Sequence, residues 1–547
     1  MTNDTYDAII VGAGFAGIYQ VYSLAKLGLN CLVIDAAGNV GGTWYSNLYP
    51  GAMSDTPSSV YRFSWDKDDL MTYPWEEGYV KQPEVLAYLN HVVDKHDLRK
   101  YMRFNTEMTA AHWQDSDQMW HLTVNGSDKI IAKYVITGLG LLSRTNLPDI
   151  PGIDTFEGDM YHTAKWPQGY DVTGKKAGVI GCGSTGVQVI TDIGCKVKQL
   201  DCYQRHPQYT VPSGDKKVTL EERKFLNDNW DSIWHLVRHS ITAFGFEESK
   251  QSYHDASPEE RERVFQEAWD IGCGFRFMFG TFNDIATDME ANKGAQDFIR
   301  KQIDTIVKDP KKAEKLKPHD VYARRPLCDG NASNGQKYFE QFNRENVDVV
   351  DLKETPIERI EAKGIQTADG KLHEHDLLIF ATGFDAVEGN YTRLAIHGRD
   401  GMSLKEYWDD LGPTSYLGSF VPKFPNFFLI SGPKGPFTNM PPSIEVQVEF
   451  ITDAIRDAEK SGVRLIEPTE EAERQYSELC DQLAENSLFW KAEDNWIFGA
   501  NIPGKKRCLR FFFGGMEAFL DKLEEVKKNG YTGFKPFTQD HAAPTRL

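Results

Sequence analysis

The chain has 547 residues and a formal net charge of −19, with 40% hydrophobic and 26% charged residues. That length exceeds what one hydrophobic core holds, so we expect about two to four domains of ordinary globular composition. The acidic balance argues against binding to nucleic acid or to an anionic membrane, and no apolar run is long enough to span a bilayer. We expect a cytoplasmic protein that is a monomer or a weak dimer.

The cysteine pattern excludes two further classes of protein. The eight cysteines are scattered along the chain and contain no C-x-x-C pair. The sequence therefore lacks both the redox motif of disulfide reductases and the ligand spacing of zinc sites. We expect buried, reduced thiols and no metal.

A first glycine-rich turn lies near the start of the chain. The apolar stretch Ala8–Val11 predicts a strand, and a helical pattern and a second strand, Cys31–Ile34, follow it. The turn between strand and helix has the spacing G-x-G-x-x-G, formed by Gly12, Gly14 and Gly17. Such glycines let a pyrophosphate approach the backbone N–H groups, and Asp35 at the tip of the second strand is placed to bind ribose hydroxyls. This arrangement predicts a dinucleotide site rather than a structural turn.

A second turn of the same kind follows in the middle of the chain. It is formed by Gly181, Gly183, Ser184, Thr185 and Gly186. The position equivalent to Asp35 is here Gln204, followed by Arg205. An acid at this tip would repel a 2′-phosphate, whereas a neutral residue beside an arginine accommodates one. The second turn therefore predicts NADP, and the alternative is that Arg205 is an ordinary solvated charge.

Two dinucleotides, one of them without a 2′-phosphate, indicate an FAD- and NADPH-dependent flavoprotein. A third segment supports this prediction. The apolar stretch Leu377–Phe380 predicts a buried strand that ends at Thr382 and Gly383. Turns of this kind join the two nucleotide domains of such enzymes, although an ordinary strand end is an equal alternative.

The segment between the two turns carries a family fingerprint. Phe156, Gly158, His162, Trp166 and Pro167 have the spacing F-x-G-x-x-x-H-x-x-x-W-P. With both turns, this pattern resembles the type I Baeyer–Villiger monooxygenases. Further stretches match the same family over nearly the whole chain: GGTWY (Gly41–Tyr45), YPGAMSDTPSSVY (Tyr49–Tyr61), YARRPLCD (Tyr322–Asp329), FPNFFLISGP (Phe424–Pro433), NMPPSIE (Asn439–Glu445) and NWIFGANIPGK (Asn495–Lys505).

The resemblance implies a reaction and its catalytic groups. NADPH reduces the flavin, O₂ forms a flavin C(4a)-peroxide, and the peroxide attacks a ketone to give an ester or lactone. The family's arginine beside the flavin matches Arg325, and the carboxylate that orients it matches Asp55. A guanidinium suits this role because it stays charged at any working pH and stabilises the negative charge of the peroxide.

The resemblance also implies cofactor contacts. Arg324 matches a basic position at the nucleotide phosphate, and Trp496 matches a tryptophan that holds the nicotinamide nucleotide. The GGTWY stretch places three residues at the FAD: Gly42, Thr43 and Trp44. His162 and Trp166 are four residues apart, so we expect them to share one face of a helical turn and to latch a linker rather than transfer protons. Met53-Ser54 and His206 depart from the family pattern.

We therefore predict an α/β fold with two dinucleotide-binding, Rossmann-like domains and a helical insertion in the second. The expected ranges are 1–145 and 385–547 for the FAD domain, 150–217 and 320–384 for the NADP domain, and 218–319 for the insertion. The active site is expected in the cleft between the domains, where Phe437, Thr438 and Met440 line the pocket. An N- or S-oxygenating flavin monooxygenase and a non-oxygenating flavin redox sensor stay open as alternatives, and the sequence does not specify the ketone.

Overall fold

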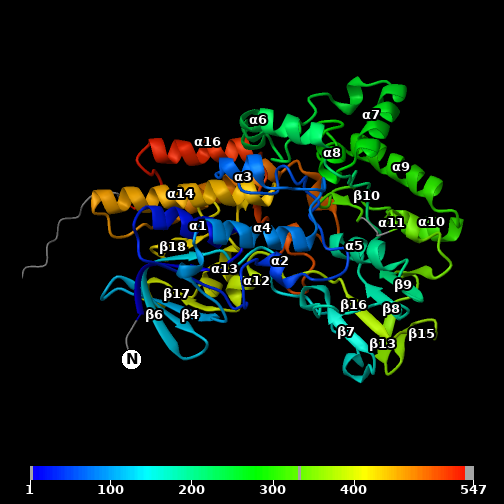
Figure 1. The fold of residues 1–547 in the computed structure, drawn as a ribbon, viewed down its shortest axis with the longest axis horizontal. Helices are drawn as coiled ribbons and strands as arrows, with labels where there is room; N and C mark the ends of the chain where they lie inside the picture. The colour runs from blue at the N-terminus through cyan, green and yellow to red at the C-terminus, as the bar shows by residue number, and fades with distance from the viewer. Residues whose placement is uncertain (1–3, 331–333, 536–547) are drawn as a thin grey trace, which may run out of the picture.

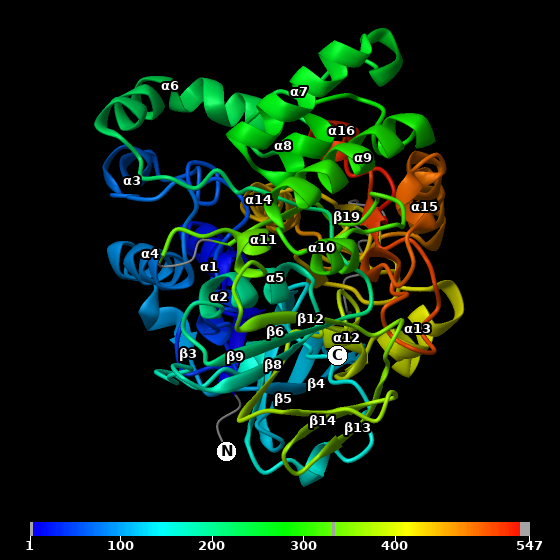
Figure 2. The ribbon, with the colours of Figure 1, turned by 90° about the vertical axis from the view of Figure 1, so that its right-hand side faces the viewer.

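The computed structural model describes residues 4–330 and 334–535. Two sheets built mainly from parallel strands lie at one side of the molecule, and a layer of helices covers them (Figures 1 and 2). The predicted α/β class with two Rossmann-like sheets is confirmed.

The first sheet takes strands from both halves of the chain. Its strand order is β17-β4-β5-β6-β1-β2-β3, and β18 pairs with the end of β6. Its strands are β1 (Asp4–Val11), β2 (Cys31–Ile34), β3 (Met102–Arg103), β4 (Met108–Gln114), β5 (Met119–Val124), β6 (Asp128–Thr137), β17 (Ala395–His397) and β18 (Phe427–Leu429). The predicted strand Cys31–Ile34 is confirmed as β2 at its predicted bounds. All four of its residues are buried, and the polar residue Asp35 follows the strand.

The second sheet has the order β12-β9-β8-β16-β7, and all of its pairs are parallel. Its strands are β7 (Asp159–His162), β8 (Lys176–Ile180), β9 (Gln199–Gln204), β12 (Val347–Asp351) and β16 (Leu377–Phe380). The predicted strand over Leu377–Phe380 is confirmed as β16, which is buried along its whole length. A small antiparallel sheet lies beside it, formed by β13 (Ile357–Glu361), β14 (Gly364–Thr367) and β15 (Leu372–Glu374).

Between the two parts of the second sheet the chain is helical. It forms α6 (Leu220–Arg238), α7 (Pro258–Ile271), α8 (Gly274–Phe279), α9 (Met289–Ile306) and α10 (Pro310–Leu316). Helix α7 begins with Pro258 in its first turn, and the Ser257 hydroxyl accepts the Glu260 N–H at 3.3 Å. Figure 2 shows α6, α7, α8 and α9 at the side of the molecule opposite the strands, whereas α10 lies closer to β12. The aromatic rings on its inner faces form a core, as in the Phe265–Phe277 pair with centroids 5.5 Å apart.

The other helices cover the sheets and connect them. They are α1 (Phe15–Lys26), α2 (Thr43–Ser46), α3 (Lys67–Thr72), α4 (Gln82–Lys95), α5 (Ser184–Ile193), α11 (Tyr338–Gln341), α12 (Gly389–Thr392), α13 (Leu404–Leu411), α14 (Met440–Ser461), α15 (Glu470–Ala484) and α16 (Gly515–Lys528). Two short pairs, β10 (Thr210–Val211) with β11 (Leu327–Cys328) and β19 (Gly435–Pro436) with β20 (Phe511–Phe512), complete the elements. None of the helices in the described part combines the length and apolar character that crossing a bilayer requires.

Strand membership supports the domain ranges that the sequence suggests, and we propose them for this chain. Residues 1–145 with 385–547 would form the FAD domain, 150–217 with 320–384 the NADP domain, and 218–319 the insertion. The first sheet draws its strands from the first of these parts and the second sheet from the second. The extreme ends, 1–3 and 536–547, and the segment 331–333 lie outside the described residues.

Helix α14 packs along α1 and holds a buried carboxylate (Figure 1). Glu445 is 1% exposed, and its side chain accepts the Ser64 N–H at 2.6 Å. Burial, and then the charge of Glu449, raise the pKa of Glu445 to about 8. The Arg238 guanidinium lies 3.8 Å away and opposes this shift only in part.

The raised pKa of Glu445 predicts a pH-dependent stability. The carboxyl binds its proton more tightly in the folded state, so its contribution is fully present below the unfolded pKa and is lost as pH rises through about 8. We expect the melting temperature of Glu445→Gln to fall less than that of the wild type between pH 5 and pH 8. The substitution removes a pH dependence of the free energy of unfolding of at most about 1.4 kcal/mol per pH unit.

The measurement is thermal unfolding of the purified protein across this pH range. Glu478→Gln, on the exposed face of α15, is the matched control and should keep the wild-type slope. Identical slopes for Glu445→Gln and the wild type would show that Glu445 is ionised throughout this range.

Candidate functional site

The first glycine turn is built by contacts that leave no room for side chains. A Cβ on Gly17 would lie 1.8 Å from the Gly12 carbonyl oxygen, and Gly12 itself has φ 109°. The Asp35 carboxylate accepts the Ala13 N–H and the Ala37 N–H, each at 2.7 Å. The predicted glycine residues and Asp35 therefore come together, with the acid ordering the turn at the end of β1 and β2.

Helix α2 stands against this turn, as the GGTWY stretch implied. The Gly41 N–H donates to the Ala13 carbonyl at 3.0 Å, and a Cβ on Gly14 would lie 3.5 Å from the Gly42 Cα. The indole N–H of Trp44 donates to the Tyr61 hydroxyl at 3.1 Å. The backbone thus approaches closely where the pyrophosphate of FAD would bind, and the residues present fit that group.

The second turn repeats the design at the N-terminus of α5. A Cβ on Gly186 would lie 2.2 Å from the Gly181 carbonyl oxygen, whereas a Cβ on Gly183 would meet no atom within 4 Å. Ser184 and Thr185 form the first turn of the helix. The open space at Gly183 and the N–H groups of the helix N-terminus fit a second pyrophosphate.

The end of β9 distinguishes the two turns. Gln204 is 2% exposed, and its side chain donates to the Lys315 carbonyl at 2.6 Å. Arg205 is largely exposed, and its guanidinium pairs with Asp494 at 2.6 Å. His206 contacts the same carboxylate at 3.2 Å. No acid stands at the tip of β9 itself, but the Asp494 carboxylate pairs with Arg205, whose charge lies at the surface beside this strand end.

A cluster of cations surrounds His206. Burial lowers the pKa of His206, and the charges of Arg324, Lys353 and Arg205 lower it further. Arg324 also pairs with Asp320 at 2.9 Å. Sequence reasoning missed Lys353. Strand β12 pairs in parallel with β9, and Asp351 lies opposite Gln204, so the residues that follow the two strands lie side by side. This strand pairing is the signal that could have identified Lys353.

The fingerprint histidine lies where the linker meets the second sheet. His162 ends β7, and residues Thr163–Lys165 form a 3-10 turn, so the expectation that His162 and Trp166 share one face of a helical turn is wrong. The His162 Nδ1 accepts the Ala164 N–H at 3.1 Å, so Nε2 carries the proton and donates to the Gly383 carbonyl at 3.1 Å. Asn146 donates to the same carbonyl at 2.9 Å. These bonds tie the linker to the turn that follows β16, and Thr382 adds a bond to the Asn146 carbonyl.

The two predicted catalytic residues meet in a bidentate ion pair. The Arg325 Nη2 donates to Asp55 Oδ1 at 2.7 Å, and Nη1 donates to Oδ2. Burial alone would lower the pKa of Arg325, and the charge and hydrogen bonds of Asp55 raise it above its ordinary value. The Phe275 ring lies 5.4 Å from the guanidinium carbon. Arg325 follows the helical insertion in the chain, whereas Asp55 comes shortly after α2. The ion pair therefore joins distant parts of the chain.

Segment 49–55 reaches Arg325 because it lies on α5. The Tyr49 hydroxyl donates to Gln188 Oε1 at 2.8 Å, and Gln188 Nε2 donates to the Met53 carbonyl at 3.0 Å. A Cβ on Gly51 would lie 2.5 Å from the Gln188 carbonyl oxygen, so only glycine fits there. Sequence reasoning did not single out Gln188, since a helical glutamine carries no motif. The Met53-Ser54 departure is accommodated because Met53 packs among aromatic rings that include Tyr79, Phe244 and Phe275.

Trp496 lies in a short 3-10 turn beside the two arginines. The neighbouring Asn495 donates to the Ala323 carbonyl at 3.3 Å, directly before Arg324 in the chain. The Trp496 ring meets Phe511 edge-on with centroids 5.7 Å apart. Trp496, Arg324 and Arg205 are therefore gathered near one edge of the second sheet, as the predicted nucleotide site requires.

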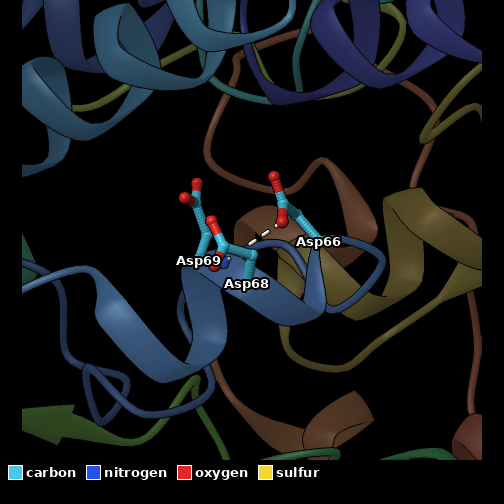
Figure 3. A group of neighbouring side chains, drawn as sticks. All are labelled: Asp66, Asp68 and Asp69. Carbon is cyan, nitrogen blue, oxygen red and sulfur yellow. Dashed lines mark hydrogen bonds between the residues drawn. The ribbon is translucent and has the colours of Figure 1, made fainter.

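One group of carboxylates in the described residues has the spacing of a metal site. Asp66, Asp68 and Asp69 lie together at the start of α3 (Figure 3). The Lys95 ammonium lies 2.9, 2.9 and 2.7 Å from an oxygen of each, respectively. Burial lowers the pKa of Lys95, but the bonds to the three aspartates raise it overall. An ammonium group thus fills the position between the carboxylates.

Comparison with known proteins gives a consistent result. The sequence profile of the family described as pyridine nucleotide-disulphide oxidoreductase matches residues 9–278. A Baeyer–Villiger monooxygenase of Pseudooceanicola batsensis is 49% identical over 531 residues, covering 96% of this chain and 95% of the relative. Cyclohexanone 1,2-monooxygenase of Acinetobacter sp. is 47% identical over 530 residues, covering 97% and 96%. The crystal structure of cyclohexanone monooxygenase from Rhodococcus sp. Phi1 bound to NADP+ superposes with a TM-score of 0.95 at 50% identity, covering 98% of this chain and all of the other.

Two glycine turns and an ion-paired arginine between two nucleotide-binding sheets define a flavoprotein that takes both FAD and NADP. This chain belongs to the type I Baeyer–Villiger monooxygenase family. It is an FAD-containing, NADPH-dependent monooxygenase whose reaction inserts one oxygen atom next to a ketone carbonyl to give an ester or lactone. N- or S-oxygenation and a silent redox sensor are not favoured.

The two turns make a paired prediction about cofactor loading. Gly17→Ala would place a Cβ 1.8 Å from a backbone oxygen of the first turn, and Gly186→Ala would do the same at 2.2 Å in the second. We expect Gly17→Ala to purify without the yellow flavin absorbance while still binding NADP+. We expect Gly186→Ala to stay yellow and to lose reduction by NADPH. Absorbance spectra and NADP+ titration measure this, and equal effects of both variants on flavin content would contradict the assignment of the turns.

Arg205 makes a prediction about nucleotide choice. Arg205→Glu should raise the NADPH concentration needed for flavin reduction far more than the NADH concentration, because only NADPH carries the 2′-phosphate. Each lost charge-assisted bond costs about 1.5–3 kcal/mol, or roughly ten- to a hundredfold in affinity. Rapid-mixing kinetics with both nucleotides measure this, with the exposed Arg359→Glu as control. Equal changes for NADPH and NADH would show that Arg205 is a surface charge.

Proposed function

We propose that Arg325 is the catalytic residue of this monooxygenase and that Asp55 is its positioning residue. The observation that carries the proposal is the bidentate ion pair between them, which joins the segment packed on α5 to the segment that follows the helical insertion. When bound, FAD and NADPH supply the activation of O₂ and the reducing hydride. Arg325 then stabilises the negative charge that develops on the reacting oxygen, and it stays charged at every working pH.

The surroundings of Arg325 suit this role. The Tyr61 hydroxyl accepts the indole N–H of Trp44. Burial is the largest cause that raises the pKa of Tyr61, and the charges of Asp55 and Arg325 lie close enough to act on this pKa as well. Aromatic rings, among them Phe275 beneath the guanidinium, form an apolar wall on one side of Arg325, whose side chain stays 28% exposed. Exclusion of water strengthens the electrostatic interaction and limits wasteful release of peroxide.

For the cofactors we propose the contacts suggested by the turns. FAD would lie along Gly12, Gly14, Gly17, Asp35, Gly42, Thr43 and Trp44, with Asp55 near its reactive end. NADP would lie along Gly181, Gly183, Ser184, Thr185 and Gly186, with Thr382 and Gly383 at the junction. Arg205, Arg324 and the newly found Lys353 would bind the 2′-phosphate, and Trp496 would hold the nicotinamide half.

For the substrate we propose a cyclic aliphatic ketone that is converted to a lactone. Support comes from the relatives named for cyclohexanone, which cover nearly the whole chain. Phe437, Thr438 and Met440 are proposed to line part of the pocket, and the Phe437 ring stacks on Phe513 at 5.5 Å. A panel of cyclic, linear and aryl ketones, with lactone, ester, N-oxide and sulfoxide as measured products, tests this choice.

We also propose that the protein acts as a cytoplasmic monomer or weak dimer, without nucleic acid or membrane as partner. The net charge of −19 supports this because it disfavours polyanionic surfaces. Size-exclusion chromatography with light scattering measures the oligomeric state directly.

Substitution of the ion pair gives the central prediction. Arg325→Ala should abolish product formation while leaving FAD bound and reducible by NADPH, since it removes only the charge that stabilises the reacting oxygen. Removal of one preorganised electrostatic partner costs about 10²–10³-fold in rate, and loss of a full charge more. Asp55→Ala should impair the same step less, because it misdirects the guanidinium without deleting it.

Stopped-flow reduction and reoxidation, combined with product analysis, separate the two half-reactions. Arg359→Ala, a surface arginine on β13, is the control for loss of a guanidinium and should behave as the wild type. Product formation by Arg325→Ala at near wild-type rate would refute the assignment of the catalytic arginine.

A further inference from the structure

A small cavity lies where segment 58–75 meets the N-terminal half of α6. Its volume is about 20 Å³, and its lining includes Arg62, Trp75, Arg223 and Trp230. Figures 1 and 2 both show α3, which belongs to this segment, directly beside α6. None of the lining residues belongs to the glycine turns or to the Arg325–Asp55 pair. The cavity is therefore separate from the nucleotide and catalytic groups.

Arg62 brings a buried charge to this cavity. Its side chain is 2% exposed, and one of its nitrogens donates to the Asp69 backbone carbonyl. Its guanidinium carbon lies 5.6 to 5.8 Å from the ring centroids of Trp75, Tyr88 and Trp230. The Nε of Arg62 has no hydrogen-bond partner among the described residues. These neutral contacts do not compensate a full positive charge removed from water.

A second arginine lines the same cavity and adds to the imbalance. Arg223 donates to the Tyr73 carbonyl at 3.2 Å and to the Trp75 carbonyl. Burial lowers the pKa of Arg62, Tyr88 and the charge of Asp69 oppose this effect only in part, and the charge of Arg223 adds to it. Within the described ranges, neither guanidinium forms an ion pair with a carboxylate. The nearest acid, Asp69, bonds Lys95 at 2.7 Å and His91 at 3.0 Å through Oδ1, while its Oδ2 has no hydrogen-bond partner among the described residues.

The other polar groups of the lining add further donors. The indole N–H of Trp75 has no partner among the described residues, and Ser58 and Ser59 contribute hydroxyls. The side-chain oxygen of Asn227 already accepts the Trp230 indole N–H at 3.1 Å. No lining residue is acidic. A water molecule needs acceptors as well as donors, whereas this lining offers chiefly donors and positive charge.

We propose that this cavity binds one small monovalent inorganic anion of the size of chloride, which neutralises Arg62 and joins α6 to segment 58–75. A volume of about 20 Å³ accommodates one species of this size, since about 10–15 Å³ suffices for a single water. Phosphate and organic carboxylates are larger. Because Arg62 contacts Tyr88 of α4 and Arg223 lies on α6, the anion fastens the helical insertion to the rest of the molecule.

Thermal unfolding of the FAD-loaded protein at constant ionic strength tests the proposal. Chloride is replaced stepwise by gluconate, which is too large for the cavity. We expect the wild type to melt about 1–3 °C higher in saturating chloride, because a ligand that binds only the folded state stabilises it. Arg62→Gln should lose this shift and should melt in gluconate at or above the wild type, since the buried charge is gone. Arg263→Gln, the same change on the exposed face of α7, should keep the wild-type shift.

A second measurement does not depend on a variant. Crystals of the wild-type holoenzyme grown with bromide in place of chloride should show an anomalous scattering peak beside Arg62. Absence of that peak would overturn the proposal. Equal melting of the wild type in chloride and gluconate, or a chloride shift retained by Arg62→Gln, would overturn it as well.

Discussion

The ion pair between Arg325 and Asp55 is the constraint on which the proposed active site depends. A guanidinium bound through two nitrogens has one orientation, so the carboxylate fixes where the positive charge points. Asp55 is in reach only because segment 49–55 lies on α5, where Gln188 holds Met53 and Tyr49. The close backbone contact at Gly51 allows this approach. The orientation of the proposed catalytic charge therefore depends on how the loops of the first sheet pack against α5 of the second nucleotide-binding unit.

Net charge says little about the local fields in this molecule. The chain carries −19 overall, yet Arg205, Arg324 and Lys353 gather around His206 at the edge of the second sheet. Asp494, two residues before Trp496 in the chain, forms an ion pair with Arg205. A carboxylate therefore already pairs with the arginine that is proposed to bind phosphate. The opposite case occurs at α3, where three aspartates surround the Lys95 ammonium. Charged clusters thus have to be interpreted together with the groups that face them.

The parts of the site that local sequence predicts are those with local causes. Gly12, Gly17 and Asp35 form one turn through contacts within a short stretch, and their spacing alone indicated that turn. The roles of Arg325 and Asp55 came only through the family resemblance, since nothing in either segment reveals its partner. The helical geometry expected for His162 and Trp166 was wrong, because β7 pairs with β16 and holds that segment extended. Lys353 was missed for the same reason: its neighbours are set by strand pairing.

The sequence by itself determined the two nucleotide-binding turns, the strands β2 and β16 at their bounds, and the start of α7. Each of these follows from short-range effects, namely the conformational freedom of glycine, the ends of apolar runs and a serine cap. Tertiary structure alone decided that Asp55 meets Arg325 across 270 positions of chain, and that Arg62 and Arg223 line one cavity. Such long-range contacts depend on how whole elements pack, because many distant segments could satisfy the same local pattern. Only the packed arrangement selects one of them.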